Sequence, residues 1–360
     1  MRATSFIVQA VPRITFPSTK RFIMSATERK TIATHDGTFH CDEVLACHML
    51  KNHTAQFKNA DIMRTRDPSR TSEAHIVVDV GAVYDPNKQR FDHHQRGFCT
   101  TFSFAGKRSR TKLSSAGLIY KHFGTEIIRN AARINNIELG AQDVVTVYNK
   151  VYDCFMEAID AIDNGITMYE SSHPPRYESS TDLSSRVAKL NAEWYETNPD
   201  QDANFLKAMD MAGKEMDECM LHVLKSWLPA RSILRSAMKE RLSLHPSGSI
   251  LVLREWAPWK DHLFSMEEDE VEEGIDKKIL YVVYKDMTGS SWRVQCVPTA
   301  KSSFQSRKPL PEPWRGIRDE ELSALTGIDD CVFAHAAGFI GGNKRYEGAM
   351  AMAKKALEAE

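Results

Sequence analysis

The sequence of 360 residues lacks three features, and each absence excludes a class of protein. Its seven cysteines are scattered and include no Cys-x-x-Cys pair, so we expect neither a disulfide framework nor a thiolate zinc site. No apolar run approaches the length that crosses a bilayer, so no membrane partner is expected. The formal net charge is −1, so any nucleic-acid contact must come from local patches and metal ions. The sequence does not indicate an oligomeric state.

The first 30 residues are poor in acids, because Glu28 is the only one among them. The segment is otherwise rich in Arg, Lys, Ser and Thr, a composition typical of a mitochondrial presequence. A disordered tail with no address is the alternative. Initiation at Met24 would remove the basic segment. We therefore expect the protein in the mitochondrial matrix, with a second form in the nucleus or cytoplasm.

Beyond this segment, apolar runs that suit buried strands alternate with helical patterns. We expect strands at 31–34 and 76–78, and helices at 42–50, from Ser114 onward and at 143–162. This alternation predicts an α/β domain over 31–180, with a doubly wound, mostly parallel sheet.

The remaining chain changes character twice. Residues 181–244 carry apolar side chains at steps of three and four, which predicts helices that connect two domains. Residues 245–360 predict a smaller α/β domain, with strands at 250–253, 279–284 and 292–297 and a final helix at 348–358. The acidic run 267–273 is expected to be a solvated loop between two strands.

Four short segments of the first domain contain side chains that bind metals. They are His35 to Glu43, Val78 to Gly81, Phe91 to His94 and Asp160 to Gly165. Each alone is unremarkable, but ligands of a parallel sheet bind beyond the carboxyl ends of its strands, so the four could converge. Mixed imidazole and carboxylate ligands suit Mn²⁺, Zn²⁺ or Fe²⁺, whereas Mg²⁺ prefers oxygen alone. Six or seven ligands are too many for one tetrahedral ion and suit two ions that share a carboxylate.

The order of these segments resembles the DHH phosphoesterase superfamily, whose signature corresponds to Asp92, His93 and His94. More narrowly, the chain resembles the melanocyte proliferating gene family within that superfamily. The matching phrases lie at 34–43, 112–120, 291–298 and 335–344, and the resemblance covers nearly everything from Lys30 onward.

The resemblance implies a set of metal ligands: His35, His40, Asp42, Asp79, His93, His94 and Asp163. Asp79 corresponds to the bridging carboxylate, and the catalytic group comprises Asp79, His93 and Asp92, which would orient one histidine. Asp160 is a weaker alternative to Asp163. His40 lies near a position where the superfamily has a carboxylate, a departure typical of the narrower family.

The resemblance also implies that the second domain binds substrate through a glycine-rich motif. Glycines there would let backbone N–H groups approach an anion, with Asn343 where many superfamily members have His. The expected substrate-binding residues are Lys112, Ser114, Ser115, His335, Gly341, Gly342, Asn343, Lys344 and Arg345.

The function implied is metal-dependent phosphodiester hydrolysis, as a 3′–5′ exoribonuclease on single-stranded RNA. Two divalent ions would activate water, with Mn²⁺ as the first expectation and Mg²⁺ or Zn²⁺ as alternatives. One alternative function is hydrolysis of small phosphoesters, such as very short oligonucleotides, cyclic dinucleotides or pyrophosphate. Another is a non-catalytic RNA-binding regulator that kept the fold.

Overall fold

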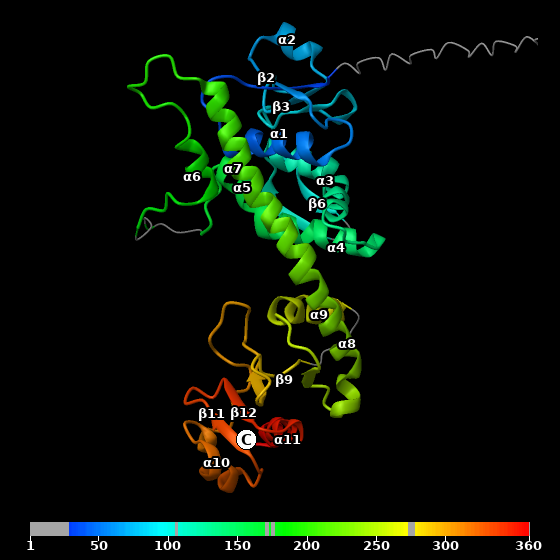
Figure 1. Ribbon diagram of the computed structural model, residues 1–360, viewed down its shortest axis with the longest axis vertical. Coiled ribbons are helices and arrows are strands. Elements are labelled where there is room, and N and C mark those ends of the chain that lie inside the picture. The colour runs from blue at the N-terminus through cyan, green and yellow to red at the C-terminus, as the bar shows by residue number, and fades with distance from the viewer. Residues whose placement is uncertain (1–28, 105–106, 170–172, 174–176, 273–277, 360) are drawn as a thin grey trace, which may run out of the picture.

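The computed structural model describes residues 29–104, 107–169, 173, 177–272 and 278–359. The predicted presequence, apart from its last two residues, lies outside these ranges. Figure 1 shows an elongated molecule with two units, one at each end of its long axis, joined by a long helical segment. We call them the N-terminal unit and the C-terminal unit.

The N-terminal unit is built on a five-stranded, mostly parallel sheet. Its strands are β1 (Thr31–Thr34), β2 (Asp61–Arg64), β3 (Ile76–Val78), β4 (Tyr84–Asp85) and β5 (Arg90–Phe91). Their order is β2-β1-β3-β5-β4, and only β4 runs antiparallel to its neighbour. Strands β1 and β3, both expected from the sequence, are therefore adjacent and parallel, which brings their carboxyl ends together.

Helices cover both faces of this sheet. Because successive side chains of a strand point to opposite faces, Ile32 joins the main core, which contains α1 (Cys41–His53) and α3 (Ser115–Ile134). Its neighbour Ala33 packs with Ala74 and Val77 on the other face, near α2 (Pro68–Glu73). Figure 1 shows α1 and α2 on opposite sides of the sheet. The prediction of a mixed α/β fold with a parallel-rich sheet is confirmed.

A continuous helical run follows α3. It consists of α4 (Ala141–Val151), a π-helical turn (Tyr152–Met156) and α5 (Glu157–Asp163), where the sequence predicted one helix over 143–162. Gly124 allows this run to pack closely on α3, because a Cβ there would lie 2.1 Å from the Tyr148 ring. A hairpin of β6 (Thr101–Phe104) and β7 (Lys107–Lys112) directly precedes α3 in the sequence.

The connecting segment begins with α6 (Leu183–Ala188) and then forms one long helical run. That run comprises α7 (Gln201–His222), a π-helical turn (Val223–Trp227) and α8 (Leu228–Leu244). Pro229 lies at the start of α8 and has no N–H to donate to the preceding turn, which gives a physical reason for the wider turn before it. The predicted helices are present, except that residues 189–200 form turns. The apolar side chains that recur at steps of three and four form a packed core face, since Phe205, Met216 and Met220 are buried.

The C-terminal unit holds a second five-stranded sheet that is mostly antiparallel. Its strands are β8 (Ile250–Leu253), β9 (Tyr281–Lys285), β10 (Trp292–Cys296), β11 (Cys331–Ala334) and β12 (Ile340–Asn343), and its helices are α9 (Lys260–Glu272), α10 (Asp319–Thr326) and α11 (Tyr346–Glu358). Their order is β11-β12-β10-β9-β8, and only β8 and β9 are parallel.

One prediction for this unit is wrong. The acidic run was expected to be a loop. Up to Glu272 it is instead helical and forms the end of α9. Glu267 is buried, and its carboxylate accepts hydrogen bonds from both terminal nitrogens of Arg307 at 2.7 Å. Arg307 lies 40 positions from Glu267 in the sequence, so the local excess of acidic residues predicted solvent exposure where Glu267 is in fact buried. Among the described residues, the helices are too short or too polar to cross a membrane.

Candidate metal centre

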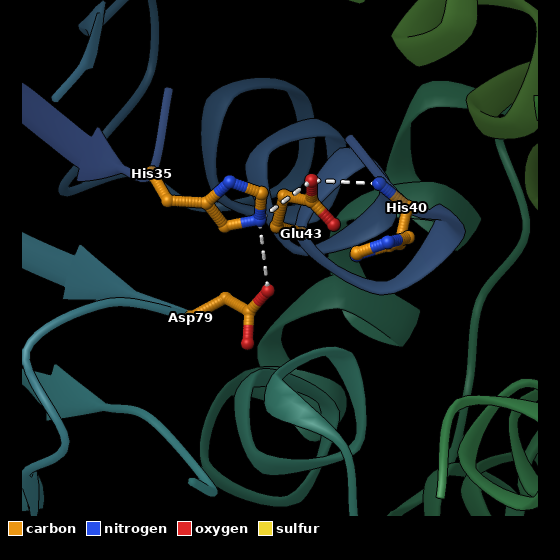
Figure 2. Close-up of side chains that lie close together, drawn as sticks. All are labelled: His35, His40, Glu43 and Asp79. Atoms are coloured by element: carbon orange, nitrogen blue, oxygen red, sulfur yellow. Dashed lines mark hydrogen bonds and ion pairs between the residues drawn. The ribbon is translucent and has the colours of Figure 1, made fainter. Parts of the chain in front are cut away.

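The centre begins at the carboxyl ends of two adjacent strands. His35 directly follows β1, and Asp79 directly follows β3. Asp79 has a φ of 56°, in the left-handed region that few residues other than glycine adopt. Backbone strain of this kind tends to cluster at functional sites. Figure 2 shows that the two side chains point toward each other across the end of the sheet.

Glu43 completes this first group of side chains. Nε2 of His35 lies 3.1 Å from Oε1 of Glu43 and 3.3 Å from Oδ2 of Asp79. The His40 backbone N–H donates to the same Glu43 oxygen at 2.8 Å, so the carboxylate also caps the start of α1 (Figure 2). Our sequence reasoning missed Glu43, although it follows the N-cap residue His40 by three positions, the spacing of a capping box. His35, His40, Glu43 and Asp79 can each direct one ligand atom to a common point.

A second group lies after β5 and shares Asp79 with the first. Nδ1 of His94 lies 3.4 Å from Oδ1 of Asp79, and Nδ1 of His93 lies 3.7 Å from the same oxygen. Oδ1 of Asp92 accepts from the His94 backbone N–H at 2.9 Å and lies 2.8 Å from His94 Nδ1. Its other oxygen accepts from Ala82 N–H at 2.6 Å. Asp92 is therefore held by the backbone and orients His94.

Asp42 and Asp163 approach His93 from two helices. Oδ2 of Asp163, at the end of α5, lies 3.1 Å from His93 Nε2. Asp42, in the first turn of α1, can direct an oxygen to the same point as His93 and Asp163. A cavity of about 260 Å³ opens here, and its lining includes His40, Asp42, Asp79, His94 and Asp163. All seven ligands predicted from the sequence therefore lie in groups that meet around Asp79 and His93.

The weaker alternative ligand, Asp160, has a different environment. Its Oδ1 accepts from the Ser114 hydroxyl at 2.8 Å and backbone N–H at 2.9 Å, and its Oδ2 accepts from Tyr152 at 3.0 Å. Burial raises the pKa of this carboxyl to about 7 despite these bonds. Asp160 thus fastens the start of α3 to α5, while Asp163 faces the ligand cluster.

The charge balance of the centre calls for a cation. Burial lowers the pKa of His35, but hydrogen bonds with Asp79 and Glu43 outweigh this and raise it to about 10. Burial, together with the nearby carboxylates of Asp79 and Asp163, holds the pKa of Asp42 well above its usual value. Burial also raises the pKa of Asp79. Several carboxylates therefore share one low-dielectric space with too little positive charge.

Two further observations fit a metal site. His35 Nδ1 lies 3.0 Å from the Asp36 carbonyl, so a neutral ring would donate there and direct its Nε2 lone pair at two carboxylates. That arrangement is unfavourable unless a proton or a metal ion lies between them. Asp42 Oδ1 and Glu43 Oε2 are buried without a hydrogen-bond partner within the described part of the chain. Imidazoles and carboxylates in this combination fit a divalent ion such as Mn²⁺ or Zn²⁺.

The predicted substrate residues next to the centre have varied environments. Ser115 is buried; its hydroxyl donates to Asp79 Oδ1 at 3.0 Å and lies 3.2 Å from His93 Nδ1. Ser114 is buried at the cap of α3. These hydroxyls position ligands and a helix in this arrangement. Lys112 is half-buried, with its ammonium 5.6 Å from the centre of the Phe98 ring.

The predicted substrate residues of the C-terminal unit lie at the other end of the molecule from the metal centre (Figure 1). Gly341 and Gly342 lie within β12, between β10 and β11, and a Cβ on Gly342 would crowd Phe333 and Arg293. Asn343 is fully buried, and its amide donates to the Asp329 carbonyl at 2.8 Å.

The remaining residues of this set are solvent-exposed. His335, Lys344 and Arg345 have exposed side chains, and Nε of Arg345 lies 2.8 Å from Asp330. The glycines thus serve close strand packing here, while exposed positive charge follows them.

Comparison with known proteins gives one consistent family. The model of the uncharacterised protein family UPF0160, MYG1_exonuc, matches residues 31–357. The MYG1 exonuclease of Homo sapiens is 45% identical over 346 residues, covering 95% of this chain and 89% of that protein. MYG1 protein C27H6.8 of Caenorhabditis elegans is 46% identical, covering 91% of this chain and 95% of its own length. MYG1 protein YER156C of Saccharomyces cerevisiae is 42% identical, covering 94% of this chain and 99% of its own length.

Among solved structures, a pGpG-specific phosphodiesterase, PggH from Vibrio, aligns with 91% of this chain and 97% of its own, at 12% identity. Its TM-score is 0.28, which supports no conclusion about fold or activity. The sequence relatives and the family model both agree with the resemblance read from the four phrases. The chain therefore belongs to the MYG1 family, the uncharacterised protein family UPF0160.

Proposed function

We propose that this protein is a metal-dependent phosphodiesterase that removes nucleotides from the 3′ end of single-stranded RNA. The observation that carries the proposal is that Asp79 belongs to two groups of ligands at once, one with His35 and Glu43 and one with His93 and His94. A carboxylate shared in this way suits two divalent ions. Relatives named MYG1 exonuclease support a nuclease. Polarity and the choice of RNA rest on the family resemblance.

The fold supports the same proposal. Its parallel order β2-β1-β3-β5, with helices on both faces, is compatible with the doubly wound arrangement of DHH phosphoesterases. On this reading the N-terminal unit is catalytic, the helices from α6 to α8 connect, and the C-terminal unit binds substrate.

Each residue has a defined task in the reaction. When bound, divalent ions, with Mn²⁺ proposed first, supply a nucleophile near neutral pH and neutralise charge on the phosphate. Asp92 holds the Nδ1 proton of His94, which leaves Nε2 free to face the cavity that this histidine lines. Ser115 holds Asp79 and His93 in fixed orientations. Preorganised ligands of this kind need no rearrangement when charge develops in the transition state.

A basic strand beside the centre supports a polyanionic substrate. Ser109 and Thr111 of β7 donate to Glu157 of α5. Arg108, Arg110 and Lys112 lie on the same strand, and both arginines are exposed. Cations spaced in this way suit successive phosphates of a single strand. Lys112 is the member nearest in sequence to Ser115 of the centre.

The test is hydrolysis of end-labelled single-stranded RNA, matching DNA and a dinucleotide, with Mn²⁺, Mg²⁺ or EDTA. The proposal expects stepwise shortening of RNA from the 3′ end with Mn²⁺ and none with EDTA. Cleavage of the dinucleotide alone would favour a hydrolase of small phosphoesters, which the near-zero net charge also suits. RNA binding without any hydrolysis would favour a regulator. The double variant Arg108→Ala, Arg110→Ala should weaken RNA binding and leave dinucleotide cleavage nearly unchanged.

A further inference from the structure

Two cysteines outside the metal centre lie against each other across two helical runs. The Cys154 and Cys219 sulfurs are 3.5 Å apart, although the residues are 65 positions apart in sequence. Cys154 lies in the π-helical turn between α4 and α5, and Cys219 lies near the end of α7. A disulfide bond has an S–S length near 2.05 Å, so the sulfurs need to approach by only about 1.5 Å.

The pair is accessible, unlike most other thiols of the chain. Cys154 is exposed and Cys219 is half-exposed, whereas Cys41, Cys47 and two further cysteines of the C-terminal unit are buried. Cys99 is also exposed, on the segment before β6. A peroxide can therefore reach the pair directly from solvent.

The local chemistry makes Cys154 the attacking thiol. The contact with Cys219 and the nearby Lys150 ammonium lower the pKa of Cys154, which is also the more exposed of the two thiols. Either sulfur can donate in that contact, so the exposure of Cys154 and the Lys150 charge beside it favour Cys154 as the attacking thiol.

We propose that Cys154 and Cys219 are a redox modification site that closes to an intramolecular disulfide on exposure to a peroxide. The Cys154 thiolate attacks one peroxide oxygen, the O–O bond breaks, and hydroxide leaves, giving a sulfenic acid at Cys154. The Cys219 sulfur then attacks the Cys154 sulfur, the S–O bond breaks, and water leaves with the thiol proton. Overall, two thiols are oxidised and one peroxide is reduced to two waters.

The position of the bond gives it a structural effect. Cys154 lies on the same continuous helical run as Asp163, and Cys219 lies on the run that leads to the C-terminal unit. Lys150, one turn before Cys154, already contacts both α9 and the run from α7 to α8. It pairs with Asp261 of α9 at 3.0 Å and lies over the Trp227 ring. The disulfide would fix the helix that carries Asp163 to the helix that carries the other unit.

The test uses the reduced full-length protein, treated with hydrogen peroxide and then with an alkylating agent. We expect peptide mass spectrometry to find a cross-link between Cys154 and Cys219 that dithiothreitol reverses. Cys154→Ser and Cys219→Ser should each abolish it, while the matched control Cys99→Ser should keep it. Closing so long a loop should also raise the Tm of the oxidised wild type by roughly 5–10 °C.

Three results would overturn the proposal. One is oxidation of Cys154 beyond the sulfenic state while Cys219 stays free. Another is a cross-link that joins either residue to a different cysteine. The third is a peroxide-treated wild type in which Cys154 and Cys219 both remain free thiols that the alkylating agent labels.

Discussion

The sharpest test of the metal centre is replacement of Asp79 by asparagine. The change removes one negative charge and keeps the shape of the side chain. Asparagine also tolerates the left-handed backbone that Asp79 adopts at a φ of 56°, so the free energy of unfolding should change by less than about 1 kcal/mol. Any large loss of activity then reports on the charge and not on the fold.

The magnitude follows from the contacts of Asp79. One oxygen lies 3.3 Å from His35 Nε2, and the other accepts from Ser115 at 3.0 Å and faces the histidines after β5. In the proposed two-ion centre the Asp79 charge acts on both bound ions. A charge-assisted contact contributes about 1.5–3 kcal/mol, so loss of one such contact to each ion weakens the metal-bound, reacting state by about 3–6 kcal/mol. At roughly 1.4 kcal/mol for each factor of ten, hydrolysis should fall by about 10²–10⁴-fold.

The assay measures turnover on end-labelled RNA with Mn²⁺, and calorimetric titration measures Mn²⁺ binding to the metal-free protein. Asp319→Asn is a matched control, because Asp319 is an exposed aspartate that also has a positive φ, of 47°. It should retain full activity. Asp79→Ala should lose activity and also about 1–2 kcal/mol of stability, because alanine is disfavoured in the left-handed region. Turnover of Asp79→Asn within about threefold of wild type would refute the reasoning, since a tenfold effect needs only ~1.4 kcal/mol.

Four further predictions concern other parts of the chain. Glu43→Gln should keep the start of α1 but weaken Mn²⁺ binding by about 10–100-fold in calorimetry; unchanged affinity would remove Glu43 from the centre. Burial raises the pKa of Asp217, but hydrogen bonds with two histidines of α1 outweigh burial and lower the pKa to about 2, below its usual 3.8. The Asp217 carboxylate therefore stabilises the fold by about 1 kcal/mol at this half-exposed site above pH ~4, and this stabilisation is lost as the pH falls toward 2. In urea unfolding, the stability of Asp217→Asn should not show this decrease between pH ~4 and 2. Changing Lys344 and Arg345 together to alanine should raise KM for RNA more than it lowers kcat and should flatten the salt dependence of binding; wild-type values of both would leave the motif a structural turn. Residues 1–30 fused to a fluorescent protein should direct it partly to mitochondria, and a uniformly cytosolic signal would contradict the presequence prediction.

Much of the metal centre could be predicted because its ligands sit at places that local patterns reveal. His35 and Asp79 directly follow two predicted strands, and parallel neighbours bring such ends together. Asp163 ends a helix before an Asn-Gly stop. Glu43 was missed because the superfamily pattern assigns the ligands of the first segment to His35, His40 and Asp42, and only the fold places the Glu43 carboxylate beside His35.

Other features depended on contacts that no local pattern contains. The burial of Glu267 depends on Arg307, which lies 40 positions later in the sequence. Gly341 and Gly342 lie in a central strand, where a Cβ on Gly342 would crowd Arg293 and Phe333. Sequence periodicity does not encode tertiary packing of this kind, and the role of these glycines in binding an anion stays a prediction.

The unbroken helical run from Gln201 to Leu244 has a consequence for how this protein can change in length. Each residue of a helix adds about 1.5 Å of rise and about 100° of rotation. A single insertion in this run would therefore swing the C-terminal unit about a quarter of a turn around the helix axis and change which of its faces is turned toward the N-terminal unit. Insertions of seven residues, close to two full turns, would restore the heading and displace the unit by roughly 10 Å. Deletions and insertions should thus be excluded from this run during evolution, while the turns at 189–200 remain free to vary.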